Sequence, residues 1–138
     1  MSSVALRAVL LLTGLAVVFL GVNVGLGGIR TLGLQGGTEF LTVTDAAIYA
    51  VRDSHVRFIG GVWLAAGLVL LAGAVALERL RTALIAVTAM VFIGGLARFS
   101  GFEPGLFGSM SILPSLLLEL VGFPLLGLWI ARTRPKAG

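Results

Sequence analysis

Four polar side chains interrupt apolar stretches of this sequence, and they are its first candidates for chemistry. Asn23, Arg57, Arg98 and Glu119 each lie in a different stretch. If these stretches cross a membrane, each buried charge costs about 2.5–3.5 kcal/mol and needs a partner or water. Three uses stay open: an ion pair of Glu119 with Arg98 or Arg57 that fixes helix register, a pocket in which an arginine binds a carboxylate or lipid headgroup, and proton-coupled chemistry at Glu119.

A second polar group flanks the second and third apolar stretches and is a possible outer rim of the same site. Its members are Asp53, His55 and Glu103. His55 is the only histidine and the chain has no cysteine, so a multi-histidine or thiolate metal site is excluded. The simpler interpretation is a helix start, with Asp53 at the positive end of the helix dipole. We expect no catalytic residue, no metal and no cofactor, and therefore no enzyme.

The composition indicates which elements hold these residues. The chain has 138 residues, of which 58% are hydrophobic and 12% charged, and its mean hydropathy is +1.10. A soluble domain of this size needs more polar surface. One membrane-spanning helix takes about 20 apolar residues. We therefore predict an all-α polytopic membrane protein, an antiparallel four-transmembrane-helix bundle that forms a single domain over residues 1–138.

The predicted spans are separated by one long loop and two shorter connections. Within the glycine-rich loop, Thr44 and Asp45 are expected to cap a short interfacial helix over residues 46–51. Residues 106–113 are expected to return to the membrane edge. With alternating helix directions, the four polar residues fall in the outer half of the bilayer. The spans are residues 4–26, 56–77, 82–99 and 114–131, and the loop is residues 27–55.

Basic residues orient the predicted bundle. The termini and the short connection between the second and third spans hold six of the ten basic residues: Arg7, Arg79, Arg81, Arg132, Arg134 and Lys136. Both termini are therefore expected in the cytoplasm, with the long loop outside. The net charge of +4 then reports topology and predicts no nucleic-acid partner. The bias toward Arg, Ala, Val, Leu and Gly is typical of a bacterial source, and thus of the bacterial cell (inner) membrane.

Glycines mark possible packing faces, because they let transmembrane helices approach closely. Gly21 and Gly25 form a GxxxG pattern. Packing inside the bundle and docking on another membrane subunit are both open interpretations. The full set of helix-packing or partner-face candidates is Gly14, Gly21, Gly25, Gly28, Gly60, Gly61, Gly94 and Gly95.

Three stretches carry a family resemblance. They are residues 53–62 (DSHVRFIGGV), Gly94–Arg98 followed by Glu103-Pro104, and Glu119-Leu120-Val121. Their order and spacing resemble the bacterial domain-of-unknown-function 4345 family, small four-helix membrane proteins with a DoxX-like arrangement. The resemblance runs from the first span to the fourth. It implies that Arg57, Arg98 and Glu119 are the family's polar positions, and it implies no activity.

Two functions from different classes remain as expectations. The first is an accessory subunit that stabilises or regulates a larger membrane complex. In size and topology the chain resembles the small four-helix subunits of bacterial membrane machines, including Mce-type lipid importers. The second is a binding protein for a lipid or lipophilic molecule that uses Arg57, Arg98 and Glu119. The expected partners are thus membrane lipids and a larger membrane complex, whereas a DoxX-like redox enzyme is disfavoured by the missing cysteine and histidine.

Overall fold

The computed structural model describes residues 3–34 and 43–133, and the elements in these ranges are helices. Four of the helical segments are long and apolar enough to cross a membrane: Val4–Thr31, Ala46–Val75, Arg81–Gly101 and Leu113–Arg132. The predicted all-α, four-span architecture is confirmed, and the chain is a multi-pass membrane protein. Its helices group into two compact units, residues 7–75 and residues 1–6 with 76–138. The single-domain assignment stays a prediction.

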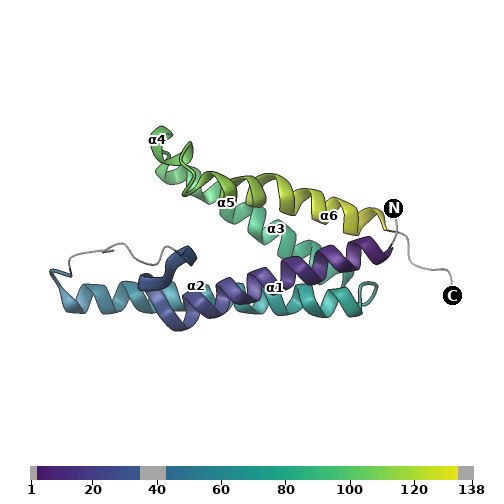
Figure 1. Ribbon diagram of the computed structural model, residues 1–138, viewed down its shortest axis with the longest axis horizontal. Helices are drawn as coiled ribbons and strands as arrows, with labels where there is room; N and C mark the ends of the chain where they lie inside the picture. The colour runs from purple at the N-terminus through teal and green to yellow at the C-terminus, as the bar shows by residue number, and fades with distance from the viewer. Residues whose placement is uncertain (1–2, 35–42, 134–138) are drawn as a thin grey trace. The chain divides into compact units, whose positions relative to one another are not determined.

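The first unit is a helical hairpin of α1 (Ser3–Gly27) and α2 (Ala46–Val75), joined in part by the 3-10 helix η1 (Gly28–Leu34) (Figure 1). Gly28 ends α1 in the left-handed region, with φ of 68°, a conformation that glycine adopts without a steric penalty. Residue numbers rise along α1 as they fall along α2 at each contact, so the helices are antiparallel. The contacting pairs are Gly14–Leu71, Val18–Gly67, Gly21–Leu64 and Gly25–Gly60.

Helix α2 begins where the cap was predicted, but it continues further than expected. Asp45 Oδ1 accepts hydrogen bonds from the backbone N–H groups of Ala47 (2.9 Å) and Ile48 (3.0 Å), which confirms its capping role. The expected break between residues 51 and 56 is wrong, because no Gly or Pro interrupts the chain there and the helix runs to Val75. Loop residues such as Gly36 and Gly37 lie outside the described residues.

The second unit pairs α3 (Arg81–Ala97) with a composite fourth span. That span consists of α5 (Leu113–Leu117), a π-helical turn η3 (Leu118–Gly122) and α6 (Phe123–Arg132). The 3-10 helix η2 (Arg98–Gly101) and the short α4 (Pro104–Phe107) connect the two spans (Figure 1). Contacts of Gly95 with Glu119 and of Thr88 with Gly127 show that α3 and the fourth span are antiparallel.

Proline accounts for the π-helical turn. Pro124 lies in the first turn of α6 and has no N–H to donate to the carbonyl four residues earlier. The backbone N–H of Phe123 instead donates to the carbonyl of Leu118, five residues back. Such turns are uncommon and are often found at functional positions. Here the turn contains Glu119.

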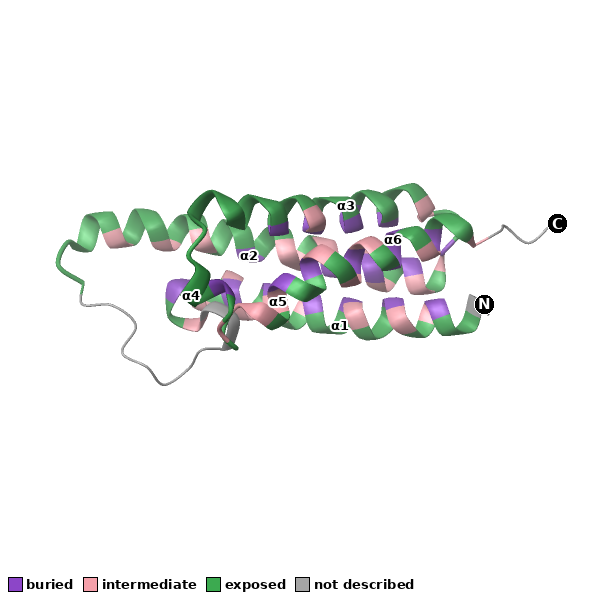
Figure 2. Ribbon diagram, turned by 90° about the horizontal axis from the view of Figure 1, so that it is seen from above, coloured by how far each residue is buried: buried purple, intermediate pink, exposed green. Residues whose placement is uncertain are grey.

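The distribution of apolar side chains suits a lipid environment. In α3, Leu84, Val87 and Val91 are buried, whereas Met90 and Ile93 are exposed. Figure 2 shows the exposed class extending along most of the α3 ribbon, with buried residues recurring on one side. An exposed surface this rich in large apolar side chains would be unfavourable in water, but hydrocarbon solvates it.

Candidate functional site: two arginine-centred clusters

The Arg98–Glu119 ion pair is the centre of the first polar cluster. Arg98 Nε donates to Glu119 Oε2 and Arg98 Nη2 donates to Glu119 Oε1, both at 2.7 Å. This bidentate geometry matches a planar guanidinium to a planar carboxylate. The Glu119 side chain is 9% exposed and that of Arg98 is 39% exposed. The pair therefore neutralises a buried carboxylate while part of the arginine stays accessible.

Two neighbouring features position Glu119. The π-helical turn carries it against Gly95 of α3, where an added Cβ would lie 2.9 Å from Glu119 Cβ and 3.4 Å from Oε2. A side chain at position 95 would thus displace the carboxylate from Arg98. Gly95 is a packing glycine whose role is to make room for a polar contact.

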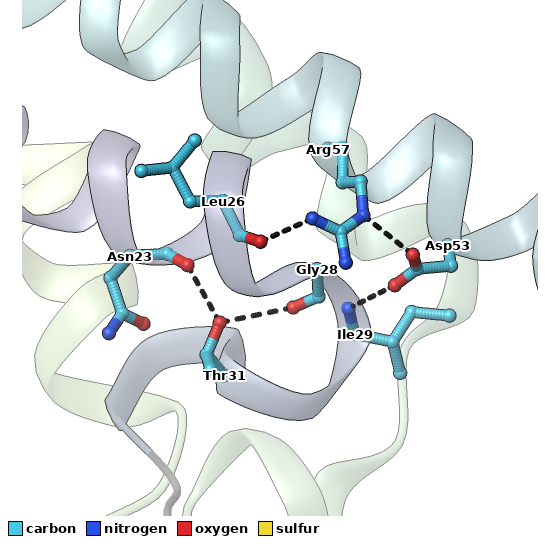
Figure 3. A network of polar contacts seen from close by, with 7 residues as sticks. All are labelled: Asn23, Leu26, Gly28, Ile29, Thr31, Asp53 and Arg57. Carbon is cyan, nitrogen blue, oxygen red and sulfur yellow. Dashed lines mark hydrogen bonds and ion pairs between the residues drawn. The ribbon is translucent and has the colours of Figure 1, made fainter.

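The second polar cluster is centred on Arg57 in the other unit (Figure 3). Arg57 Nε donates to Asp53 Oδ2 at 2.6 Å, one turn earlier on α2, and Nη1 donates to the carbonyl of Leu26. Asp53 Oδ1 also accepts the backbone N–H of Ile29 at 2.8 Å. The two side chains therefore hold the C-terminal end of α1, including one of its unpaired carbonyls, against α2.

Asn23 lies at the edge of this second cluster. The Thr31 hydroxyl donates to the carbonyl of Asn23 at 2.7 Å and lies 3.3 Å from that of Gly28, which folds η1 back onto α1 (Figure 3). Asn23 Oδ1 is buried, and none of the described residues donates a hydrogen bond to it. Its backbone, not its amide, connects Asn23 to the network.

The four predicted site residues thus divide between the two units. Arg98 pairs with Glu119, one of the two partners expected, and Arg57 pairs with Asp53. Whether all four line one pocket stays a prediction. Asp53, predicted as a rim residue, is a bonding partner in the second cluster, and the signal for it was the four-residue spacing to Arg57.

The other predicted rim residues make simpler contacts. His55 is exposed on α2, and Glu103 precedes α4, where its carbonyl accepts the N–H of Phe107 at 2.9 Å. Within residues 3–34 and 43–133, no three His, Asp or Glu side chains are grouped so that they could hold a metal ion.

Two further arginines bond helix ends, although their positions in the sequence were expected only to orient the bundle. Arg7 Nη1 donates to the carbonyls of Ala74 (2.8 Å) and Val75 (2.6 Å), at the C-terminus of α2. Arg81 Nη2 donates to the carbonyl of Ala131, in the last turn of α6. A cation at a helix C-terminus satisfies carbonyls that have no intrahelical donor. Their position in the sequence was the available signal, because each lies near the start of a helix whose antiparallel neighbour ends nearby.

The predicted packing glycines fall into two groups, those in contact with another helix or side chain and those without a neighbour in the part of the chain that the structure describes. An added Cβ would meet atoms of the same unit at six of them, and at Gly61 and Gly94 it would meet no atom within 4 Å among the described residues. Gly21 and Gly25 therefore serve the α1–α2 contact, and any partner face must lie elsewhere. The six glycines in contact are Gly14, Gly21, Gly25, Gly28, Gly60 and Gly95.

Comparison with known proteins yields one family. No curated protein and no solved structure matches the chain. The sequence profile described as a domain of unknown function (DUF4345) matches residues 5–130. That range contains both arginine-centred clusters and all four apolar spans except their outermost residues. The description assigns no activity, and the DoxX-like arrangement stays a prediction. The match covers most of the 138 residues, so this membrane protein belongs to the DUF4345 family.

Proposed function

We propose that this chain is a small accessory subunit that associates with a larger complex of the bacterial cell membrane and stabilises or regulates it. The observation that carries the proposal is the pair of open glycines. On α2, Gly60 packs against Gly25 while Gly61 is open, and on α3, Gly95 packs against Glu119 while Gly94 is open. An open glycine in a span lets a helix of another subunit approach closely.

The polar clusters support an associating role over a catalytic one. Arg7, Arg57, Arg81 and Arg98 each bond a carbonyl or carboxylate of their own unit. These hydrogen bonds hold helices together, and each oxygen of Glu119 accepts one of them. A general acid or base needs a proton site within reach of a substrate, whereas both oxygens of this carboxylate are bonded to Arg98 and its side chain is only 9% exposed.

The partner that we propose is a larger membrane machine. An Mce-type lipid importer is the example suggested by the chain's size and four-helix topology, and this likeness is one of architecture alone. The exposed apolar side chains of the spans are compatible with any such assembly. The partner must therefore be identified by isolation.

A native pull-down tests the accessory role. The protein, tagged at its C-terminus, is extracted from its own membranes in mild detergent, and co-purified proteins and lipids are analysed by mass spectrometry. We expect a stoichiometric membrane assembly that is lost on Gly61→Leu or Gly94→Leu while the melting temperature is kept. The control is Gly105→Leu, at another open glycine outside the long spans. Recovery of the chain without any partner protein would contradict the proposal.

The proposed orientation places both termini in the cytoplasm, and it can be tested separately. It rests on the excess of Arg and Lys at the termini and in the short connection between α2 and α3. The natural sequence has no cysteine, so single cysteines report accessibility without background. In intact cells, a membrane-impermeant maleimide should label Ser100→Cys and leave Arg79→Cys unlabelled. The reverse pattern would invert the topology.

A second candidate function, lipid binding, is favoured by the exposure of Arg98. Its side chain is 39% exposed although its partner Glu119 is nearly covered. An arginine held in place by a carboxylate and still accessible is prepared to donate to a second oxyanion. The lipid analysis of the same pull-down tests this candidate, because a specifically retained lipid without partner proteins would favour it over the accessory role.

A further inference from the structure

We infer that Arg98 and the phenylalanine cluster beside it (Phe99, Phe102 and Phe107) bind the phosphate and glycerol region of a membrane phospholipid. The inference rests on the lipid-binding candidate above and does not depend on the accessory role. It names the ligand as a glycerophospholipid and the recognised group as its phosphate. All residues involved belong to the unit that contains α3.

Arg98 has donors left for such a ligand. A guanidinium carries five N–H donors, and the ion pair occupies one on Nε and one on Nη2. The remaining three have no acceptor among the described residues. Because Glu119 is buried and Arg98 is partly exposed, the free donors lie on the accessible side of the pair. A phosphate oxygen can accept from them without displacing Glu119.

The phenylalanine cluster supplies an apolar surface at the same end of the span as Arg98. Phe99 follows Arg98 directly in η2, and its ring centroid lies 5.9 Å from that of Phe102 and 5.2 Å from that of Phe107. Phe107 is buried, whereas Phe99 and Phe102 are 45% and 56% exposed. The two outer rings therefore rest on a buried third ring and present their surfaces outward.

The position along the span identifies the occupant as lipid. Arg98 lies three residues before the end of the apolar segment Arg81–Gly101, which is about 6 Å along the 3-10 helix η2. That depth corresponds to the border between acyl chains and headgroups, where an arginine reaches phosphates and apolar rings contact glycerol and the first methylenes. A free phosphate ion would gain nothing from the rings.

The net charge of the Arg98–Glu119 pair predicts which lipids the site should prefer. Arg98 and Glu119 together carry no net charge, so hydrogen bonds to the phosphate, more than charge attraction, hold the headgroup. Zwitterionic phosphatidylcholine and anionic phosphatidylglycerol should then bind alike, and diacylglycerol, which has no phosphate, should bind weakly. This pattern separates the site from a basic surface that attracts any anionic lipid.

Native mass spectrometry of the purified full chain tests the inference. Detergent micelles are loaded with equal amounts of phosphatidylcholine, phosphatidylglycerol and diacylglycerol that have the same acyl chains. We expect both phospholipid adducts to exceed the diacylglycerol adduct about tenfold. Arg98→Gln combined with Glu119→Gln removes both charges without leaving one unpaired, and should lower phospholipid adducts to the diacylglycerol level. Equal retention of all three lipids by the natural chain would overturn the inference.

A matched pair of phenylalanine variants keeps the test decisive if the double glutamine variant does not fold. Phe102→Ala should lower phospholipid adducts about threefold, whereas Phe19→Ala, at a similarly exposed ring (55%) on α1, should leave them unchanged. Equal effects of the two variants would contradict the site. Millimolar inorganic phosphate should not displace the lipid, and displacement would show that the phosphate ion, not the phospholipid, is the ligand. The purified chain is used alone, so failure here leaves the pull-down result standing.

Discussion

Each of the two helical units holds a pair of antiparallel helices together, and the two units use different contacts to do so. In each, an arginine near the start of the first helix bonds at least one carbonyl at the C-terminus of its antiparallel neighbour: Arg7 to Ala74 and Val75, and Arg81 to Ala131. At the opposite end, each has an arginine in an ion pair, Arg57 with Asp53 and Arg98 with Glu119. The ends are alike, and the contact surfaces between them differ.

Glycine dominates the contact between α1 and α2. An added Cβ at Gly60 would lie 2.5 Å from Gly25 Cα, and one at Gly21 would lie 2.6 Å from Leu64 Cα. The two backbones are thus close enough for many van der Waals contacts. Such close approach requires each glycine to lie opposite its contact on the other helix, and the hydrogen bonds at the two ends hold the same register.

Side-chain chemistry dominates the contact between α3 and the fourth span. Glu119 reaches across to Arg98, and the Thr88 hydroxyl, which donates to Ile85 within α3, faces Gly127. The ion pair fixes the register directly, because no other carboxylate lies in the fourth span. The comparison teaches that close backbone approach and a buried ion pair are alternative means of fixing a helix pair in lipid. They should fail differently when they are altered.

The largest loss of stability is expected when the ion pair is broken from one side. Arg98→Ala leaves the Glu119 carboxylate without its partner in an apolar surrounding, at a cost of about 3 kcal/mol. Unfolding of the purified protein in a detergent titration would measure it. The control, Arg98→Gln with Glu119→Gln, should cost clearly less because no lone charge remains. Equal losses would mean that the pair stabilises by packing and not by charge.

A smaller loss is expected in the glycine contact. Gly60→Leu forces a side chain against the backbone of Val24 and Gly25 and should cost about 1–3 kcal/mol. Its matched control is the next residue: among the described residues, Gly61→Leu meets no atom within 4 Å of the added Cβ and should change stability by less than about 0.5 kcal/mol. The same unfolding titration applies. Similar losses at both positions would refute the division between packed and open glycines.

The smallest effect is expected at the exposed end of the first hairpin. Asp53→Asn removes the charge that pairs with Arg57 and weakens the acceptor for the Ile29 amide, and solvent screening keeps the loss of stability below that of the two changes above. Hydrogen–deuterium exchange should speed up at Ile29 without a change in α3. Asp45→Asn is the control, since asparagine caps a helix as well as aspartate does, and it should leave Ile29 protected.

Hydropathy and helix-capping residues were sufficient to predict much of the fold from the sequence. Apolar runs of span length predicted four helices, and Asp45 was placed at the start of α2, because both signals depend on residues close in sequence. The break predicted before Val56 was wrong for the same reason. The polar residues Arg52 to Arg57 suggest a helix start locally, but contacts of Asp53 and Arg57 with the end of α1 allow one continuous helix.

The sequence by itself determined the membrane class, the four spans and the short set of polar residues that must find partners. Only the tertiary structure decided the partners: Arg98 for Glu119, Asp53 for Arg57, and helix-end carbonyls for Arg7 and Arg81. It also decided which glycines are packed and which are open. The physical reason is that hydrophobic length is a property of a segment, whereas an ion pair or a close backbone approach depends on helix rotation and register. Those depend on contacts between residues far apart in the chain.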